Sequence, residues 1–151
     1  MAQVNVYIDG LERIMTNLTH MGVDAKKAIM DGMKTSGKQI QGSAKRLCPV
    51  DTGELRNSIT VEEIPDGVSI GTNCEYAVYV EFGTGIHGDP SVPHTTKTHW
   101  TYKRADTGQF VTTSGQPPQP YLHPAMIANM NNVKTIIKSS LTRALANARR
   151  R

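Results

Sequence analysis

The sequence predicts an α+β fold in which a small antiparallel sheet packs against two long amphipathic helices, with an extended hairpin arm. Residues 24–48 and 124–148 each carry apolar side chains at three- and four-residue intervals, the spacing of a helix with one buried face. Residues 58–71 contain two short apolar-rich runs around a Pro-Asp-Gly turn, which is typical of a β-hairpin. Residues 86–120 hold five of the eight prolines, which indicates an arm or long loop outside the core.

The chain is long enough for one domain but short for two, since it has 151 residues. Only 38% of them are apolar and 5% aromatic, so the chain has few side chains with which to build a core. Further apolar surface could be buried against partner subunits. We therefore expect a single α+β domain over residues 1–151. A protruding arm is expected at about 86–119 and a basic C-terminal end at 149–151.

The N-terminal part predicts a strand followed by a short helix. Residues 4–8 alternate apolar and polar side chains, as in a half-buried strand, and Asp9-Gly10 then turns the chain. Helical spacing follows up to about Gly22, at Leu11, Ile14, Met15 and Leu18. The segment has no basic region followed by a long apolar run, so we do not expect a signal peptide.

The first long helix is expected to begin at Asp24, a residue type that caps helix N-termini, and to be stopped by Pro49. Its apolar stripe consists of Ile29, Met33, Ile40, Ala44 and Leu47. Five lysines occupy the opposite face, namely Lys26, Lys27, Lys34, Lys38 and Lys45. Gly32 and Gly37 weaken the helix but permit close approach of a neighbouring element.

The loop at Pro49 to Gly53 is expected to lead into strands at 58–64 and 68–71. A second hairpin is expected inside the arm, around Asp106-Thr107-Gly108. Between the two hairpins, residues 75–85 read EYAVYVEFGTG. The apolar run in this stretch fits a buried strand or a short buried helix, and periodicity alone does not decide between them.

The last helix is the clearest element. Pro124 suits the first turn of a helix. The apolar stripe that follows comprises Met126, Met130, Val133, Ile137, Leu141, Ala144 and Ala148, which predicts a helix of about 25 residues.

Positive charge is concentrated at the C-terminal end of the chain. The net charge is +4, and the segment from Tyr121 to Arg151 carries six basic residues and no acidic one. A basic end of this kind can contact nucleic acid or an acidic protein surface. It can also simply complement the negative end of a helix dipole.

No combination of side chains predicts catalysis. Glu75 and Glu81 could in principle act as a general acid and base, but nothing brings them together, and we expect each to be solvated or ion-paired. Gly83-Thr84-Gly85 lacks the spacing and lysine of a phosphate loop, so the glycines are expected to permit a positive φ instead. We therefore predict no catalytic residue.

Metal, thiol and base-stacking sites are not expected either. The histidines at 87, 94 and 99 lack a zinc-ligand spacing, and Cys48 and Cys74 form neither a CxxC pair nor a disulfide framework, so both are expected to be reduced. Trp100, Tyr102 and Phe110 could stack on bases, but cross-strand packing in a hairpin explains them more simply. We predict no metal and no cofactor. No run of 18 apolar residues is present, so we expect no membrane contact.

Three motifs in order resemble a family of morphogenesis proteins of long-tailed bacteriophages, described as tail-completion, head–tail joining or minor tail proteins. The family pattern consists of TGxLxxSI, YAxxxExGT and PFLxPA elements, and here it falls at 52–59, 76–84 and 120–125. The residues that carry it are Thr52, Gly53, Leu55, Ser58, Ile59, Tyr76, Ala77, Glu81, Gly83, Thr84, Pro120, Leu122, Pro124 and Ala125. Tyr121 stands where phenylalanine is usual.

The resemblance implies a structural virion protein of the neck or upper tail, made in the host cytoplasm and without enzymatic activity or cofactor. It implies a homo-oligomeric ring, expected to be a hexamer, that contacts a head-side connector or stopper and a tail-tube or terminator protein. A tail terminator or minor tail component is the alternative. Arg149, Arg150 and Arg151 are the candidate contacts to DNA in the passage or to an adjacent ring. Two other classes stay open, namely a DNA-binding protein that uses the basic C-terminal helix and a small hydrolase that uses Glu81 or a histidine.

Overall fold

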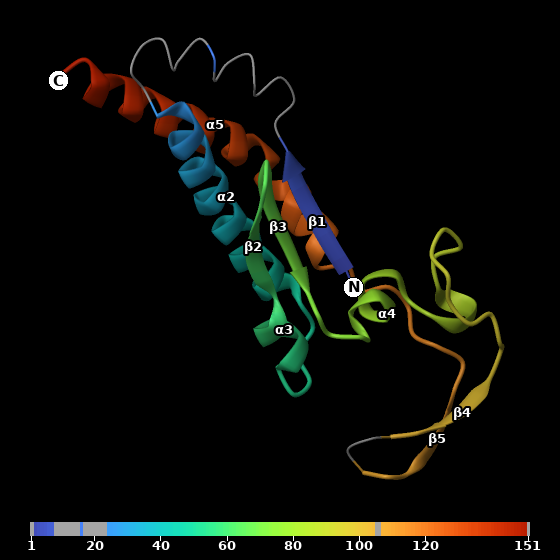
Figure 1. The fold of residues 1–151 in the computed structure, drawn as a ribbon. Helices are drawn as coiled ribbons and strands as arrows, with labels where there is room; N and C mark the ends of the chain where they lie inside the picture. Colours follow the sequence, from blue (N-terminus) through green and yellow to red (C-terminus); the bar gives the residue numbers. More distant parts are fainter. Residues whose placement is uncertain (1, 8–15, 17–23, 105–106, 151) are drawn as a thin grey trace.

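Two long helices and a three-stranded antiparallel sheet make up the body of the molecule (Figure 1). The computed structural model describes residues 2–7, 16, 24–104 and 107–150. The elements, in chain order, are β1 (Ala2–Tyr7), α2 (Ala25–Leu47), α3 (Glu54–Ser58), β2 (Thr60–Ile64), β3 (Gly67–Thr72), α4 (Ala77–Phe82), η1 (Gly85–His87), β4 (Trp100–Lys103), β5 (Phe110–Thr113) and α5 (Leu122–Ala148). The predicted α+β class is confirmed, whereas the helix predicted near residues 11–22 lies almost entirely outside the described residues.

The sheet has the order β1-β3-β2, and all neighbouring strands are antiparallel. Val68 and Ile70 on the central strand are fully buried, and Val4, Val6 and Val61 on the flanking strands pair with them in register. The side chains that alternate with them are mostly polar, so only one face of the sheet contributes to the core. The predicted hairpin is confirmed, but Ser58, expected to begin the strand, instead ends the short helix α3.

Helix α2 follows the sequence prediction closely. The Asp24 side chain accepts a hydrogen bond from the Lys27 backbone N–H at 3.0 Å, which satisfies one of the free donors of the first turn. The apolar stripe is buried as far as Ala44. Leu47 is half exposed, at 50%, which corrects the predicted stripe. Cys48, four residues after Ala44, takes the next interior position instead.

The two glycines of α2 lie where other elements come closest. A Cβ built on Gly32 would lie 3.0 Å from Ile137 Cα on α5, and one built on Gly37 would lie 2.8 Å from a methyl carbon of Val61 on β2. Both distances are shorter than ordinary carbon–carbon contacts. The glycines therefore allow α5 and the sheet to pack directly on the backbone of α2, as the sequence indicated.

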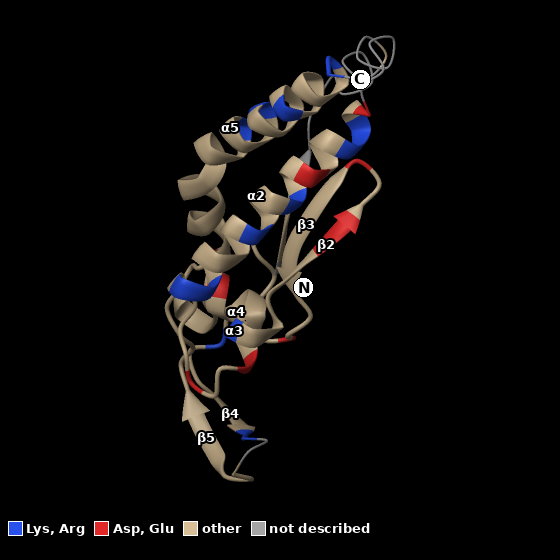
Figure 2. Ribbon diagram, turned by 90° about the vertical axis from the view of Figure 1, so that its left-hand side faces the viewer, with Lys and Arg blue, Asp and Glu red and all other residues tan. Residues whose placement is uncertain are grey.

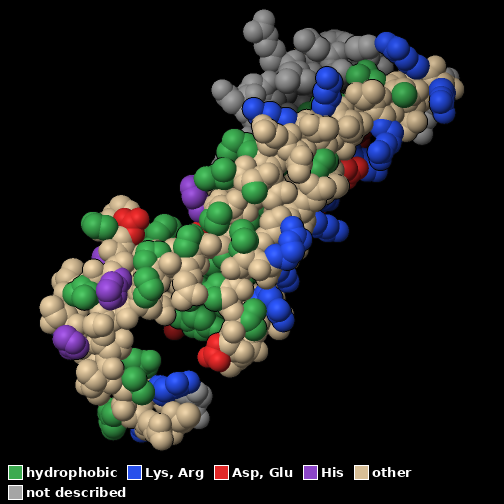
Figure 3. Space-filling view, turned by 180° about the vertical axis from the view of Figure 1, so that it is seen from behind, with side chains coloured by type: hydrophobic (Ala, Val, Ile, Leu, Met, Phe, Trp, Pro, Cys, Tyr) green, Lys and Arg blue, Asp and Glu red, His purple; other side chains and the backbone are tan. Residues whose placement is uncertain are grey.

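Helix α5 is long, and most of its apolar stripe is only partly buried. Only Leu122, Ala125 and Asn129 are buried, and Met130 is 44% exposed. The stripe borders a groove of about 680 Å³ next to Val6 of β1. Apolar side chains are correspondingly visible on the face of the molecule that carries α5 (Figure 3). The predicted helix is confirmed, but the other described elements bury its apolar stripe only in part.

The stretch EYAVYVEFGTG forms the short helix α4, so the helical alternative is the right one. Ala77 and Glu81 are buried, whereas Tyr76 and Tyr79 are 41% and 45% exposed. The expected buried aromatic segment is therefore wrong, because helical periodicity places the tyrosine rings on the outer side. Beyond α4, the predicted second hairpin is present as β4 and β5, which project from the body (Figure 1).

Candidate functional site

Glu81 caps helix α5 from a different element. Its side chain is only 4% exposed, and its carboxylate accepts hydrogen bonds from the backbone N–H groups of Tyr121 (2.9 Å), Leu122 (3.0 Å) and His123 (2.9 Å). Helix α5 has no capping side chain of its own and no acidic residue in its first turn. The carboxylate therefore satisfies the free donors and complements the positive end of the helix dipole. We call this arrangement the Glu81 clasp.

The clasp corrects the expectation that Glu81 is solvated or ion-paired, whereas Glu75 is exposed as expected. A buried carboxylate needs strong hydrogen-bond partners, and here they are backbone donors about 40 residues further along the chain. Local sequence patterns do not show such partners. The sequence offers two signals for this contact. Glu81 stands two residues before Gly83-Thr84, and the start of α5 has no capping side chain or acidic residue of its own.

Gly83 and Gly85 hold the chain against the segment that leads into α5. Both have positive φ, 74° and 66°. A Cβ on Gly83 would lie 2.8 Å from Pro118 Cδ and 2.9 Å from the Gln116 carbonyl oxygen, and one on Gly85 would collide with the Ser114 backbone. Glycine is needed here for conformation and for space. The Thr84 N–H donates to the Gln116 carbonyl at 3.0 Å, so the two segments are paired.

The first motif turns the chain sharply into the short helix α3. Gly53 has φ of 85°, and Leu55 in the following turn is 4% exposed. The Ser58 hydroxyl lies 2.5 Å from the Thr72 hydroxyl at the end of β3, and the Tyr76 hydroxyl donates to Glu54 at 3.4 Å. These contacts bring the first motif to the second. Because the Glu81 clasp brings the second to the third, the three motifs form one contiguous cluster.

Tyr121 lies fully buried beside the clasp, and its hydroxyl is the one buried side-chain polar atom without a hydrogen-bond partner in the described part of the chain. Burial, with Glu81 next in importance, raises the pKa of this phenol above its usual range, so the ring is neutral. A phenylalanine at this position would fill the same space without a hydroxyl that lacks a partner. Leu122 and Ala125 complete the buried start of α5, whereas Pro120 is exposed and Pro124 half-buried.

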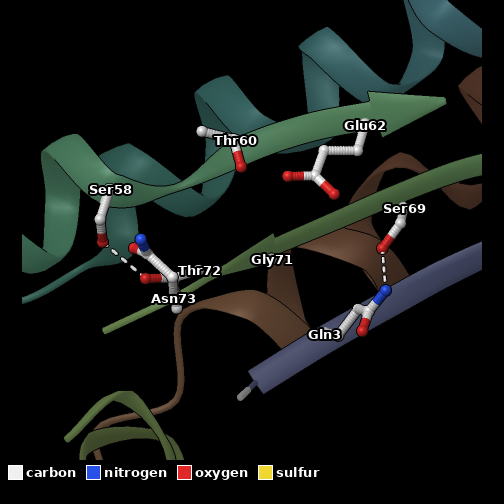
Figure 4. A pocket seen from close by; sticks show the side chains of 8 residues that line it. All are labelled: Gln3, Ser58, Thr60, Glu62, Ser69, Gly71, Thr72 and Asn73. Atoms are coloured by element: carbon white, nitrogen blue, oxygen red, sulfur yellow. Dashed lines mark hydrogen bonds between the residues drawn. The ribbon is translucent and has the colours of Figure 1, made fainter. Parts of the chain in front are cut away.

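The outer face of the sheet carries a shallow polar hollow of about 450 Å³ (Figure 4). Its lining includes Gln3, Thr60, Glu62 and Ser69, with the Gln3 amide donating to the Ser69 hydroxyl. Glu62 is the single charged side chain among the lining residues, and no histidine or cysteine accompanies it. The hollow therefore lacks the nucleophile–base or acid–base pair that a hydrolase requires.

The other chemical candidates do not assemble into a site. Within residues 2–7, 16, 24–104 and 107–150, no group of three His, Cys, Asp or Glu side chains is placed to hold a metal ion. Cys48 and Cys74 are buried and free, and burial raises the pKa of the Cys48 thiol, which disfavours the reactive thiolate. Arg149 and Arg150 are exposed and follow the last turn of α5, far from the clasp (Figure 2).

Residues 12–83 match the family model described as "Bacteriophage HK97-gp10, putative tail-component". Over these residues the chain is similar to the HK97-gp10-like family. The matched stretch contains the first motif and the second as far as Gly83, and it therefore includes Glu81. No curated protein and no solved structure matches the chain.

The resemblance to phage tail morphogenesis proteins is thereby confirmed at the level of a phage tail component. The HK97-gp10-like family is a non-enzymatic family of tail structural components. None of the helices in the described ranges has the length and apolarity that a membrane crossing requires. Within this family framework, the clasp, the glycine crossing and α3 are structural devices that fix the arm and α5 on the body.

Proposed function

We propose that this protein forms a homo-oligomeric ring of six copies in the neck or upper tail of a long-tailed phage, where it joins or completes the tail at the head–tail junction. The match to a tail-component family carries the proposal. Its neighbours would be a head-side connector or stopper on one side and a tail-tube or terminator protein on the other, with DNA in the central passage.

The surface of the molecule supports assembly. Phe110 at the end of the hairpin is 75% exposed and Ile86 at its base is 58% exposed. On the body, Met130 lines the groove beside α5 and is 44% exposed, and Ile127 on the same helix is 56% exposed. Exposed apolar surface on two separate parts of one chain is typical of surfaces that become buried when a protein binds its partners.

Deleting the gene in its phage tests the proposal. The expected result is separate filled heads and tails that do not join, with wild-type particles restored by the full chain supplied in trans. Immunogold labelling of restored particles should place the protein at the head–tail junction. Label along the tail tube or at its distal tip would favour a minor tail component instead. Label over the head shell, or none in the particle, would contradict the proposal.

DNA binding through the basic end of α5 is the second candidate, favoured by the absence of any acidic residue from Tyr121 to Arg151. Neutralising several phosphates releases counterions, so affinity should fall steeply with salt, by about 0.9 log unit per log unit of salt for each phosphate contacted. Filter binding of the purified chain to duplex DNA over a salt series measures this slope. A slope near zero would exclude this function.

A further inference from the structure

A cleft of about 540 Å³ lies between the hairpin arm and the loop that precedes α3, and the space-filling view shows the hollow between arm and body (Figure 3). We call it the arm cleft. On the body side its lining includes Val50, Asp51, Glu54 and Tyr76, and on the arm side Tyr102. Val50, Tyr76 and Tyr102 are 54%, 41% and 46% exposed, so the apolar and aromatic surface inside the cleft is not filled by the chain itself.

The lining chemistry of the arm cleft suits a planar cation. Two aromatic rings, from Tyr76 and Tyr102, face a space that also contains the carboxylates of Asp51 and Glu54. A guanidinium group can stack on a tyrosine ring and pair with a carboxylate at the same time, which a lysine ammonium does less well. Arg104 on the arm side reduces the charge of the lining but leaves it negative, so a phosphate group would be repelled.

A matching cationic group exists on the same chain, at the other end of the molecule. Arg149 and Arg150 are exposed directly after the last turn of α5. No acidic side chain follows Tyr121 in the sequence, so no neighbour on α5 neutralises them. Figures 1 and 2 both show the C-terminal end of α5 and the hairpin at opposite ends of the elongated molecule, so a chain cannot place its own arginines in its own cleft.

We propose that the arm cleft binds the Arg149–Arg150 end of a second copy of this chain. The inference rests on the proposed ring and names one of its contacts. Because the two surfaces differ and lie at opposite ends, the contact is heterologous, and repeating it produces a closed ring or an open filament rather than a symmetric dimer. Burial of Val50 and of the two tyrosine rings would accompany the charge pairing and exclude water from it.

A charge exchange in the full chain tests this contact. The first variant carries Arg149→Glu with Arg150→Glu, and the second carries Asp51→Lys with Glu54→Lys. Sedimentation should show self-association of the wild type, which is weaker at 500 mM than at 50 mM salt. Each variant should raise the dissociation constant of this self-association by about tenfold or more. A chain with all four substitutions, or an equimolar mixture of the two variants, should recover part of the lost association, since the opposite charges again meet although glutamate does not stack on the tyrosine rings as a guanidinium does. Melting curves verify that each variant is folded.

Two matched controls carry the same charge changes elsewhere. Lys26→Glu with Lys38→Glu reverses two exposed cations of α2, and Asp31→Lys with Glu62→Lys reverses two exposed carboxylates on the body. Both controls should associate like the wild type. If they weaken association as much as the test variants, or if the four-substitution chain recovers none of it, net charge rather than the cleft controls association and the proposal is wrong.

Cross-linking in phage particles separates this inference from the proposed function. A photoactivatable residue at position 149 should cross-link to residues 49–55 or 102–104 of another copy. Cross-links only to DNA or to a different protein would overturn the inference while leaving a neck ring intact. Absence of the protein from particles, with charge-exchange recovery in solution, would overturn the function but support the contact. A wild-type chain that stays monomeric and gives no cross-link between copies would overturn the contact.

Discussion

Removing the Glu81 carboxylate should cost more stability than any other single side-chain truncation at a polar residue of the described chain. Glu81→Ala leaves three backbone N–H groups, at Tyr121, Leu122 and His123, without the acceptor that now lies 2.9 to 3.0 Å away. Each unpaired buried donor costs about 1–3 kcal/mol, and water that enters the vacated space recovers part of this. We expect a loss of about 3–6 kcal/mol in the free energy of unfolding, a large fraction of the stability of a domain this size.

The conservative variant separates charge from shape. Glu81→Gln keeps one carbonyl oxygen as an acceptor but places an amide NH₂ against a backbone donor and removes the negative charge at the start of α5. We expect it to lose about 1.5–3 kcal/mol, since hydrogen bonds to charged groups contribute roughly this much. Glu75→Gln is the matched control, because Glu75 is exposed, and it should change stability by less than about 0.5 kcal/mol.

Urea unfolding followed by circular dichroism gives the free energies, and hydrogen exchange at residues 121–123 reports the clasp directly. The exchange rates of these amides should rise in Glu81→Gln even at urea concentrations where the fold is intact, while amides in the middle of α2 stay protected. A loss below about 1 kcal/mol in Glu81→Ala, or unchanged exchange at residues 121–123, would refute the reasoning that the carboxylate holds the start of α5.

Four further outcomes concern the same cluster, the C-terminal end and the arm. Tyr121→Phe should raise the free energy of unfolding by about 1 kcal/mol in the same urea assay, because it removes a buried hydroxyl that has no partner, and a clear loss would mean that the hydroxyl is satisfied. Gly85→Ala should fail to give folded protein by circular dichroism, since its Cβ meets the Ser114 backbone at a positive φ, whereas Gly42→Ala in the open part of α2 should fold normally. Deleting residues 149–151 should leave the melting temperature within about 1 °C and reduce the yield of joined particles in a plaque assay, because the packed part of α5 ends before them. Limited trypsin digestion of the free protein should cut first in the arm, at Lys97, Lys103 or Arg104, apart from trimming at the exposed C-terminal arginines, and cleavage within the body while the arm stays intact would contradict its exposure.

Elements whose caps and apolar stripe lie within their own residues could be predicted from the sequence. Features that depend on contacts with residues far away in the sequence could not. Helix α2 was predictable because its cap at Asp24, its stripe and its terminating proline all lie within the element. Helix α3 has five residues, too few to show a helical period, so the sequence predicts a loop and the start of a strand in its place. The long stripe of α5 predicted burial, but burial depends on how much surface the other elements offer. The burial of Glu81 cannot be predicted locally for the same reason, since its hydrogen-bond partners lie in another part of the chain.

The clasp also explains how a long arm can be inserted without disturbing the body. The chain leaves the body after Gly83 and returns before Tyr121, and the two ends of the arm are held together by backbone hydrogen bonds from Thr84 to Gln116 (3.0 Å) and from Gln119 to Val80 (2.8 Å). With both ends fixed, extending the arm adds little to the entropy cost of loop closure, about 0.6 kcal/mol for each doubling of length. The fold of the body and the start of α5 therefore depend on the clasp and on the glycine crossing, whereas the sequence beyond them is free to fit a partner. The arm and the end of α5 can therefore change to fit a partner while the core that positions both stays the same.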